Sequence, residues 1–400
     1  MTRAPAALPH LAITASTLTT ACGVGWSAHR AALRENRSGL RPNDFEPAAG
    51  LETWIGRVDG LEAMPLREGL ARYDCRNHRL ARLAAGQDGF PRAVERARAK
   101  HGEARIGLFV GTSTSGILDT ELVARRQGPR GPWAFDADHY RYRHGMAALA
   151  RFLREVLGVA GVSATVSTAC SSSAKVFAMA QRAIGAGQCD AAVVAGVDSL
   201  ALSTLQGFRA LQLLSKQPCR PFAVDRDGLS IGEAAGFALL ERDGDAGATL
   251  IGTGESSDAF HMSSPSPEGE GAQMAMHAAL DAARVAPRDI DYVNMHGTGT
   301  PANDAAEAAA VRAVLGGDVP CSSTKGWTGH ALGAAGIVEA LDALDAIASG
   351  TIPGNLGGEA VDPRVACRIE RATRAGAVRR AMSNSFGFGG SNCSLVFGAP

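Results

Sequence analysis

Short apolar runs alternate with longer segments of helical periodicity along this chain. The apolar runs are continuous, which is typical of strands that are covered on both faces. They lie at residues 105–110, 163–166, 191–196, 237–241 and 292–295. The Ala-rich segments between them carry apolar residues three and four positions apart and predict helices at residues 174–184, 273–283, 305–315 and 337–347. This alternation predicts an α/β protein built from layers.

Two segments of the chain share one order of features. Residues 165–184 and 321–347 each read as a strand, a tight turn of small residues and a long helix. This likeness indicates a duplication, and the polar stretch 243–248 marks the predicted boundary. We therefore predict an N-terminal half at residues 1–245 and a C-terminal half at residues 246–400. No linker between them is long enough to make them independent domains.

Composition and charge narrow the function classes. The 400 residues are 46% hydrophobic and 20% charged, which is typical of a folded soluble protein. Lys and Arg total 40 and Asp and Glu total 40, so the net charge of zero argues against nucleic acid or a membrane as the main partner. The chain shows neither a signal-peptide pattern nor a spanning apolar run, so we expect a cytoplasmic protein. Eight cysteines without a C-x-x-C pair argue against a zinc or redox motif.

Cys170 lies between the apolar run at 163–166 and a helix of small residues, in the segment STACSSS. This placement puts its sulfur at a helix N-terminus, where free backbone N–H groups and the helix dipole favour the thiolate. A thiolate attacks carbonyl carbons, so the segment predicts a nucleophile. A buried, inert cysteine is the competing interpretation, and this segment alone leaves both open.

Two histidines lie in turns rich in Gly and Thr. His296 opens the segment HGTGTPAND directly after a strand, where loop residues face the cleft at the strand ends. His330 lies in KGWTGHALGAAG, shortly after Lys325 and before Glu339 of the following helix. A single histidine in such a loop more often has its hydrogen bonds made within the fold and no catalytic role. Two histidines in loops of this kind favour a shared functional site.

A glycine turn, NSFGFGGSN at residues 384–392, leads into the last strand. Glycines let backbone N–H groups approach a ligand closely. No Lys-Ser or Lys-Thr follows them, so the turn is not a phosphate loop. An oxyanion site is the better functional interpretation.

These four segments, in this order and at this spacing, resemble the elongating, two-histidine β-ketoacyl-acyl carrier protein synthases of the thiolase superfamily. The resemblance covers about residues 105–398. It implies an α/β thiolase-like fold, in which duplicated α/β halves form five layers in the order α-β-α-β-α. It also implies a decarboxylative Claisen condensation that joins an acyl thioester to malonyl on an acyl carrier protein.

The resemblance implies catalytic roles for four residues. Cys170 takes the acyl chain from the phosphopantetheine arm of the carrier protein as a thioester. His296 and His330, as neutral imidazoles, then stabilise the enolate left when malonyl-carrier protein loses carbon dioxide. Lys325 orders the site electrostatically.

Further positions have supporting roles by the same resemblance. The backbone N–H groups of Cys170 and Phe388 form the oxyanion hole, and Phe388 also acts as a gate, with Phe386 beside it in the turn. The hydroxyls of Thr298 and Thr300 bind the pantetheine amides.

The remaining implied positions surround the same site. Thr114 falls where the family has a residue that shapes the pocket, and Glu339 and Asp304 support the network around Lys325. No catalytic metal or cofactor is expected, because phosphopantetheine arrives on the carrier protein. A structural cation is left open, near Asn294, Glu339, Ser383 and Asn384.

The implied partners are an acyl carrier protein and a second ketosynthase-like chain, either a copy of this one or a related chain. Because carrier proteins of this class are acidic, local Arg clusters are candidates for the docking site. Two Arg-rich segments that read as surface insertions, 36–100 and 125–145, supply them. The candidates are Arg72, Arg76, Arg79, Arg125, Arg126 and Arg130.

Some positions depart from the family pattern. Residues 13–17 lack the usual Gly-x-Gly, and Trp327 replaces a smaller or phenolic residue. The departure at 13–17 leaves the first fifty residues outside the pattern. Trp327 and Thr114, together with YDCRNHR at residues 73–79, resemble the aryl polyene or polyketide subgroup more than the fatty acid enzymes.

Three alternatives compete with a condensing enzyme. A thiolase acting on acyl-coenzyme A has the same fold but normally needs a second catalytic cysteine, for which Cys393 is the candidate near the C-terminus. A non-catalytic partner subunit would lack the nucleophile. A binding or structural protein would require all four segments to be packing features.

Overall fold

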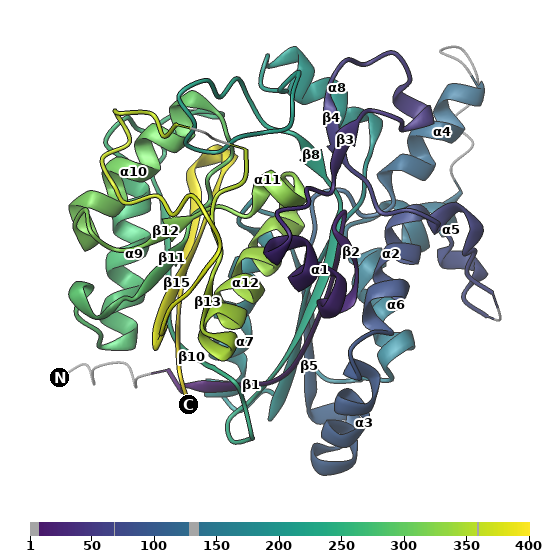
Figure 1. Cartoon of the computed structure of the whole chain (residues 1–400). Helices are drawn as coiled ribbons and strands as arrows, with labels where there is room; N and C mark the ends of the chain where they lie inside the picture. Colours follow the sequence, from purple (N-terminus) through teal and green to yellow (C-terminus); the bar gives the residue numbers. More distant parts are fainter. Residues whose placement is uncertain (1–7, 68, 128–135, 358–359) are drawn as a thin grey trace.

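The computed structural model describes residues 8–67, 69–127, 136–357 and 360–400. One long mixed sheet dominates it, and in Figure 1 the two parts of this sheet face each other across a pair of central helices. The strand order is β12-β11-β15-β16-β10-β1-β9-β7-β5-β6, with β2 paired to β1 beside this path. β1 and β10 join the two parts through the short register Leu11↔Leu250 and Ala12↔Thr249.

Each part of the sheet comes from one side of residue 245 along the chain. The first part contains β1 (Leu11–Thr20), β2 (Gly23–Val24), β5 (Ile106–Gly111), β6 (Ser163–Val166), β7 (Ala191–Asp198) and β9 (Ala234–Glu241). The second contains β10 (Thr249–Ser257), β11 (Tyr292–Asn294), β12 (Cys321–Ser322), β15 (Arg380–Gly387) and β16 (Ser391–Gly398). The strands expected from apolar runs are confirmed, with shifts of at most three residues at their ends. The boundary near residue 245 falls between β9 and β10 and stays a prediction.

The helices form three layers around the two parts of the sheet (Figure 1). Between the parts lie α7 (Ser172–Gly185) and α12 (Ala335–Ser349). One outer face carries α2 (Arg76–Ala85), α3 (Phe90–His101) and α6 (Ala147–Leu157), and the other carries α9 (Glu270–Ala283) and α10 (Pro301–Leu315). The expected five-layer order α-β-α-β-α is therefore confirmed. The four expected helices begin two to four residues earlier than predicted, because first-turn residues such as Ser172 and Pro301 add nothing to an apolar periodicity.

The hydrophobic core is divided in the same way as the helix layers. One buried cluster joins α7 and α12 to both parts of the sheet, a second lies under α2, α3 and α6, and a third lies under α9 and α10. α12 is buried on nearly all sides, which explains why its sequence is apolar almost throughout. The acidic side chains Glu339 and Asp342 on this helix are nevertheless buried, so each needs a polar partner.

The Arg-rich segment 36–100 does more than cap the surface. It contains α2 and α3, and Leu80 and Phe90 from these helices are fully buried in the cluster under the outer layer. The expectation of a surface insertion is wrong for these two helices. Their solvent-facing Arg residues dominate the composition, while a narrow apolar stripe packs on the sheet.

Shorter elements complete the described part of the chain. A small sheet has the order β3-β4-β8, with β3 at Leu40–Pro42, β4 at Trp54–Gly56 and β8 at Ile231–Gly232. β13 (Thr351–Ile352) pairs with β14 (Arg374–Ala375). The remaining helices are α1 (Gly25–Arg34), α4 (Ile117–Gln127), α5 (Ala137–His139), α8 (Leu202–Ala210) and α11 (Lys325–Thr328). Among the described residues, none of the helices has the length and apolar character needed to cross a membrane.

Close packing of α9 on β10 can be tested at Gly254. A methyl group at this position would collide with the backbone of Ala275 and Ala279 in α9. We expect Gly254→Ala to lower the free energy of unfolding by about 1 to 3 kcal/mol, because the helix has to move away from the strand. Gly207 is the matched control: it lies exposed within α8 with open space around it, so Gly207→Ala should raise stability by about 0.5 to 1 kcal/mol. Thermal unfolding that shows equal effects at both positions would contradict this account.

Candidate active site

Cys170 lies in a tight turn between β6 and α7. Ala169, the residue before it, has a φ of 51°, which is unusual for a residue with a side chain. The hydroxyl of Ser172 holds the turn, since it accepts from the backbone N–H of Thr168 at 2.9 Å and donates to the carbonyl of Ala169 at 2.6 Å. The turn presents the Cys170 sulfur at the N-terminal end of α7, as the sequence predicts.

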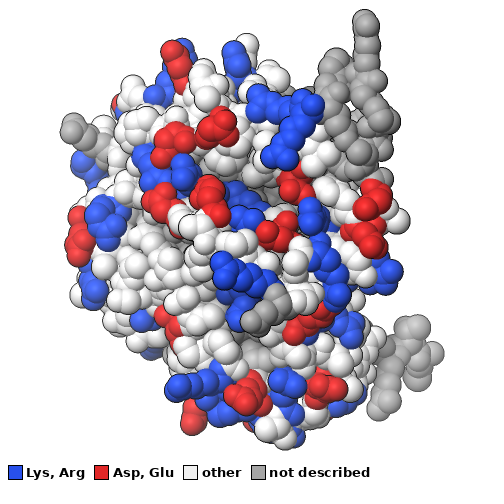
Figure 2. Space-filling model, turned by 90° about the vertical axis from the view of Figure 1, so that its right-hand side faces the viewer, with Lys and Arg blue, Asp and Glu red and all other residues white. Residues whose placement is uncertain are grey.

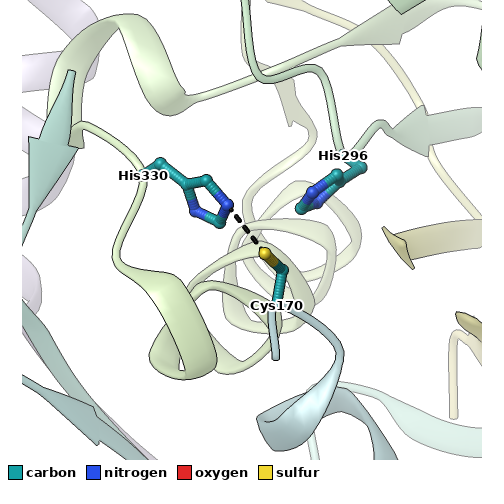
Figure 3. Close-up of side chains that lie close together, drawn as sticks. All are labelled: Cys170, His296 and His330. Atoms are coloured by element: carbon teal, nitrogen blue, oxygen red, sulfur yellow. Dashed lines mark hydrogen bonds between the residues drawn. The ribbon is translucent and has the colours of Figure 1, made fainter. Parts of the chain in front are cut away.

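The two histidines approach Cys170 from separate loops (Figure 3). The Nε2 atom of His330 lies 3.1 Å from the Cys170 sulfur. The imidazole rings of His296 and His330 are nearly perpendicular, with centroids 5.2 Å apart. All three side chains are buried, so the structure brings together the three residues that sequence analysis placed in one site.

The backbone of each histidine is held by a different partner. His296 follows β11, and the carboxylate of Glu307 accepts from the N–H groups of His296 and Gly297, each at 2.7 Å. His330 is clamped by residues at β8: its N–H donates to the carbonyl of Ser230 at 2.7 Å, and its carbonyl accepts from the N–H of Gly232 at 3.0 Å. Each histidine backbone therefore has an anchor of its own, in addition to the contacts that join the two loops.

Lys325 is the buried cation of the site. Its ammonium group donates to the Glu339 carboxylate and to the backbone carbonyl of His296, and lies 3.3 Å from Nδ1 of the His296 ring. The other oxygen of Glu339 accepts from the Ser385 hydroxyl at 3.0 Å. Burial raises the pKa of Glu339 to about 7, against the opposing effect of Lys325. Lys325 therefore connects α12, the His296 loop and its own loop.

The imidazoles are neutral near pH 7. Burial and the charge of Lys325 hold the pKa of His296 and the pKa of His330 well below the ordinary value, and the neighbouring His296 lowers that of His330 further. Because an ammonium group only donates, Nδ1 of His296 has to accept and Nε2 carries the proton. Nδ1 of His330 has no hydrogen-bond partner among the described residues, so its tautomer is free to change. His296 is thus a fixed donor, whereas His330 can donate or accept at Nε2.

The resting thiol differs from the sequence expectation. Burial raises the pKa of the Cys170 thiol to about 11, although Lys325 and the backbone N–H groups of Phe388 and Cys170 oppose the increase. The helix N-terminus is therefore not enough to produce a resting thiolate, because desolvation in the buried turn outweighs it. His330 at 3.1 Å is in place to accept the proton when the thiol reacts.

A cavity of about 230 Å³ opens in front of these groups. It is lined by Cys170, His296 and His330, by Thr298 and Thr300, and by Phe386 and Phe388. The hydroxyls of the two threonines lie 2.9 Å apart, and the Phe388 ring stacks on Phe208 with centroids 5.6 Å apart. Seven of the predicted site residues thus surround one space.

Four predicted residues do not line this cavity: Lys325 and Glu339, described above, and Thr114 and Asp304. The hydroxyl of Thr114 donates to Asp198 at 2.7 Å and accepts from Asn77 at 3.2 Å, so it is part of a buried polar cluster. Asp304 accepts from the N–H groups of Phe222 and Gly299 at 2.8 and 3.1 Å and thereby shapes the loop that follows His296.

Two buried carboxylates that support the site escaped sequence analysis. Glu307 holds the His296 loop, and its position one helical turn after Asp304 could have suggested this role. Asp198 accepts from the backbone at Ser113 and Thr114 and, at 3.2 Å, from the N–H of Ala334. No local pattern around Asp198 indicates this, because its partners lie far away in the chain.

The three reactive side chains also have the spacing of a possible metal site. The Cys170 sulfur and one nitrogen from each of the two histidines lie within 4.8 Å of one another, and these are ligand types that zinc prefers. However, a protonated Nε2 on His296 cannot bind a metal, and the charge of Lys325 opposes a cation. The arrangement fits hydrogen-bond donors around a nucleophile better.

The position expected for a structural cation has two unused oxygens. Asn294 and Ser383 are register partners on β11 and β15, and neither Asn294 Oδ1 nor Ser383 Oγ has a hydrogen-bond partner among the described residues. Both side chains are buried. The other two expected ligands are engaged, since Asn384 accepts from Ser394 and Glu339 binds Lys325. The donor set fits a hard cation only in part.

Comparisons with known proteins agree with this geometry. The family models described as beta-ketoacyl synthase, N-terminal domain and C-terminal domain, match residues 87–246 and 247–359. A 3-oxoacyl-[acyl-carrier-protein] synthase 2 from Rhizobium meliloti is 37% identical over 316 residues, covering 72% of this chain and 73% of the relative. The corresponding protein of Vibrio cholerae is 36% identical, covering 74% of this chain and 76% of the relative.

A solved structure extends the likeness to the full chain. A chain from the complex of a ketosynthase with its chain length factor, from Xenorhabdus doucetiae, superposes with a TM-score of 0.87 at 35% identity. The alignment covers 100% of both chains. The fold therefore extends beyond the residues that the family models match.

The raised pKa of Cys170 can be tested by alkylation. We expect the rate of Cys170 modification by iodoacetamide to keep rising with pH above 9, because a thiol with a pKa of about 11 is still mostly protonated there. Peptide mass spectrometry of the modified protein measures this rate, with Cys170→Ser as the control for assignment. A plateau below pH 9 would contradict the raised value.

Proposed function

The chain belongs to the β-ketoacyl synthase family, and from this premise we propose that it is an acyltransferase that condenses an acyl group on Cys170 with malonyl on an acyl carrier protein. The observation that carries the proposal is the convergence of one thiol and two neutral imidazoles on a single cavity. Lys325 supports the donor role of His296, because it leaves the proton of this ring on Nε2.

The first half-reaction loads the enzyme. The Cys170 sulfur attacks the carbonyl carbon of the acyl thioester, while Nε2 of His330 accepts the thiol proton. The N–H groups of Cys170 and Phe388, which oppose the effect of burial on the thiol, are the proposed oxyanion hole. The C–S bond to the carrier arm then breaks, and its thiolate takes up the proton from His330.

The second half-reaction forms the carbon–carbon bond. Malonyl thioester loses carbon dioxide, and the electron pair of the broken bond becomes an enolate whose oxygen accepts from Nε2 of His296 and His330. One such fixed donor is worth about 3 to 4 kcal/mol in comparable sites. The enolate carbon attacks the acyl carbonyl, the bond to the Cys170 sulfur breaks, and the thiolate takes up one proton from solvent, which balances the negative charge of the malonyl carboxylate. Phe388 stands as the proposed gate, and Thr298 and Thr300 as hydroxyls for the pantetheine amides.

Two competing functions fit less well. A thiolase would need Cys393 as its second cysteine, but this residue is fully buried in the central hydrophobic cluster and does not line the cavity. A non-catalytic partner subunit would not need a thiol, two neutral imidazoles and a buried lysine in mutual contact.

We propose an acyl carrier protein and a second ketosynthase-like chain as partners, since the matching chain from Xenorhabdus doucetiae belongs to a complex of a ketosynthase with its chain length factor. Whether the second chain is a copy of this one or a related chain stays a prediction, as do the cytoplasmic location and the aryl polyene or polyketide subgroup. A structural cation at Asn294 and Ser383 is likewise a proposal, supported by their two unused oxygens.

The predicted docking arginines differ in how well they can meet an acidic partner. Figure 2 shows the face that carries α2 and α4, where basic and acidic side chains alternate. Arg76 is nearly buried and binds Glu233, while Arg72 and Arg79 bind other acidic groups of this chain. Arg130 lies outside the described residues. We therefore restrict the docking proposal to Arg125 and Arg126, at the exposed end of α4.

The proposed function is tested by intact-protein mass spectrometry. Incubation with a panel of acyl-carrier proteins should add an acyl group to the wild type, and malonyl-carrier protein added later should remove it as an elongated product. Cys170→Ser should show neither step, and His296→Ala should load but not elongate. A wild type that never loads, alone or with candidate partner chains, would refute the proposal.

The neutral histidines predict an unusual pH dependence. A pKa well below 6.5 keeps both imidazoles neutral as the pH falls to about 6. The imidazolium form, which cannot accept a proton, therefore does not accumulate in this range. We expect the malonyl decarboxylation rate of the acylated enzyme to show no titration of the histidines from pH 7.5 to about 5.5, so any change in this range should follow Glu339, whose pKa is about 7. A fall with an apparent pKa near 6.5 that persists in Glu339→Gln would show that the site holds ordinary histidines.

A further inference from the structure

A buried ion pair outside the cavity joins the N-terminal helix α1 to the central helix α12. Nε2 of His29 lies 2.8 Å from Oδ1 of Asp342, and both side chains are 0% exposed. The two residues are separated by 313 positions in the chain. Neither of them lines the cavity.

His29 is a cation at neutral pH. Burial alone would lower the pKa of His29, but the charge and hydrogen bond of Asp342 raise it to about 10. A buried pair of this kind is often no more stable than well-packed apolar residues, whereas the loss of one partner leaves a costly buried charge. The stability that the His29–Asp342 pair contributes to the fold therefore does not explain why this pair lies between α1 and α12.

The second oxygen of Asp342 reaches the segment that carries Lys325. Oδ2 accepts from the Thr324 hydroxyl at 2.6 Å, and Thr324 immediately precedes Lys325 at the start of α11. Asp342 lies three residues after Glu339, so both carboxylates project from one face of α12. α12 therefore holds this segment twice, through the Lys325 side chain and through the residue before it.

α1 holds the same segment directly as well. The indole N–H of Trp327 donates to the carbonyl of Ala32 in α1 at 3.2 Å. Trp327 is packed in a small buried cluster with Cys22, Ala32 and Leu33. The hydroxyl of Ser38, just after α1, donates to the carbonyl of Gly326 at 2.9 Å. Residues 22–38 thus form the outer support of α11.

The far end of this segment has its own anchor. The backbone of His330 is bound on both sides by residues at β8 and does not depend on Asp342. Lys325 contacts His296, which acts in condensation, whereas His330 contacts the thiol that is acylated. Disturbing Thr324 should therefore affect the two half-reactions unequally.

We propose that His29 and Asp342 are positioning residues which, through Thr324, hold Lys325 in place against His296. This proposal rests on the proposed condensing function. It extends the machinery of the site to α1, which contributes nothing to the lining of the cavity.

The test measures both half-reactions separately in variants along this chain of contacts. Thr324→Val removes the hydroxyl that Asp342 binds and leaves the ion pair intact, and His29→Gln removes the cation. We expect both variants to acylate Cys170 within about twofold of the wild-type rate, while the condensation of bound acyl groups with malonyl-carrier protein slows by about tenfold to a hundredfold. Thr324→Ser keeps the hydroxyl and should restore condensation.

A neighbouring surface pair provides the matched control. Arg30 and Asp345 join the same two helices, with Nε of Arg30 2.8 Å from Asp345 Oδ1, but this pair does not contact Thr324. Arg30→Gln should leave both half-reactions unchanged.

Three results would overturn the proposal: unchanged condensation in Thr324→Val, equal slowing of both half-reactions, or equal rates in the Val and Ser variants. If Thr324→Val does not fold, the same two rates in His29→Gln decide. A wild type that fails to load refutes the proposed function instead, so the two failures are distinguishable.

Discussion

The buried ammonium group of Lys325 is the interaction on which the site depends. It binds Glu339 of α12 and the backbone of His296, and its position against Nδ1 determines which nitrogen of that ring carries the proton. Its charge also keeps the pKa of both imidazoles low and opposes the effect of burial on Cys170. After burial, which causes the largest shift in each case, this single cation thus acts on the pKa of three groups, and its effect is strong because the site is dry and the charge is poorly screened.

The five-layer fold explains how the three reactive side chains meet. Cys170 lies at the start of α7, His330 precedes α12, and these two helices lie side by side between the parts of the sheet. His296 follows β11 in the second part of the sheet. Buried carboxylates hold two of the surrounding loops. Glu307 binds the backbone of the His296 loop, and Asp198 binds the backbone of the turn at Ser113. Precise placement of this kind requires rigid elements, because small displacements of reacting groups cost large factors in rate.

The site residues that could be predicted from the sequence are those that lie in short local motifs. The strand and helix around Cys170, the Gly and Thr turns around the histidines and the glycine turn before β16 were all visible as patterns, and the structure brings seven of the predicted residues to one cavity. The local pattern was misleading where burial decides the outcome. The thiolate expected at a helix N-terminus is a protonated thiol, and Thr114 bonds to Asp198 rather than facing the cavity.

The sequence by itself determined the layered α/β architecture, the positions of the main elements and the identity of the reacting groups, because periodicity and turn chemistry depend on neighbours within a few residues. Tertiary structure alone decided the protonation states, the supporting carboxylates and the contact between α1 and the Lys325 segment. These depend on desolvation and on pairs such as His29 and Asp342, which are 313 positions apart and leave no pattern along the chain. Burial and long-range charge pairing exist only once the chain has folded, and they give the local motifs their chemistry.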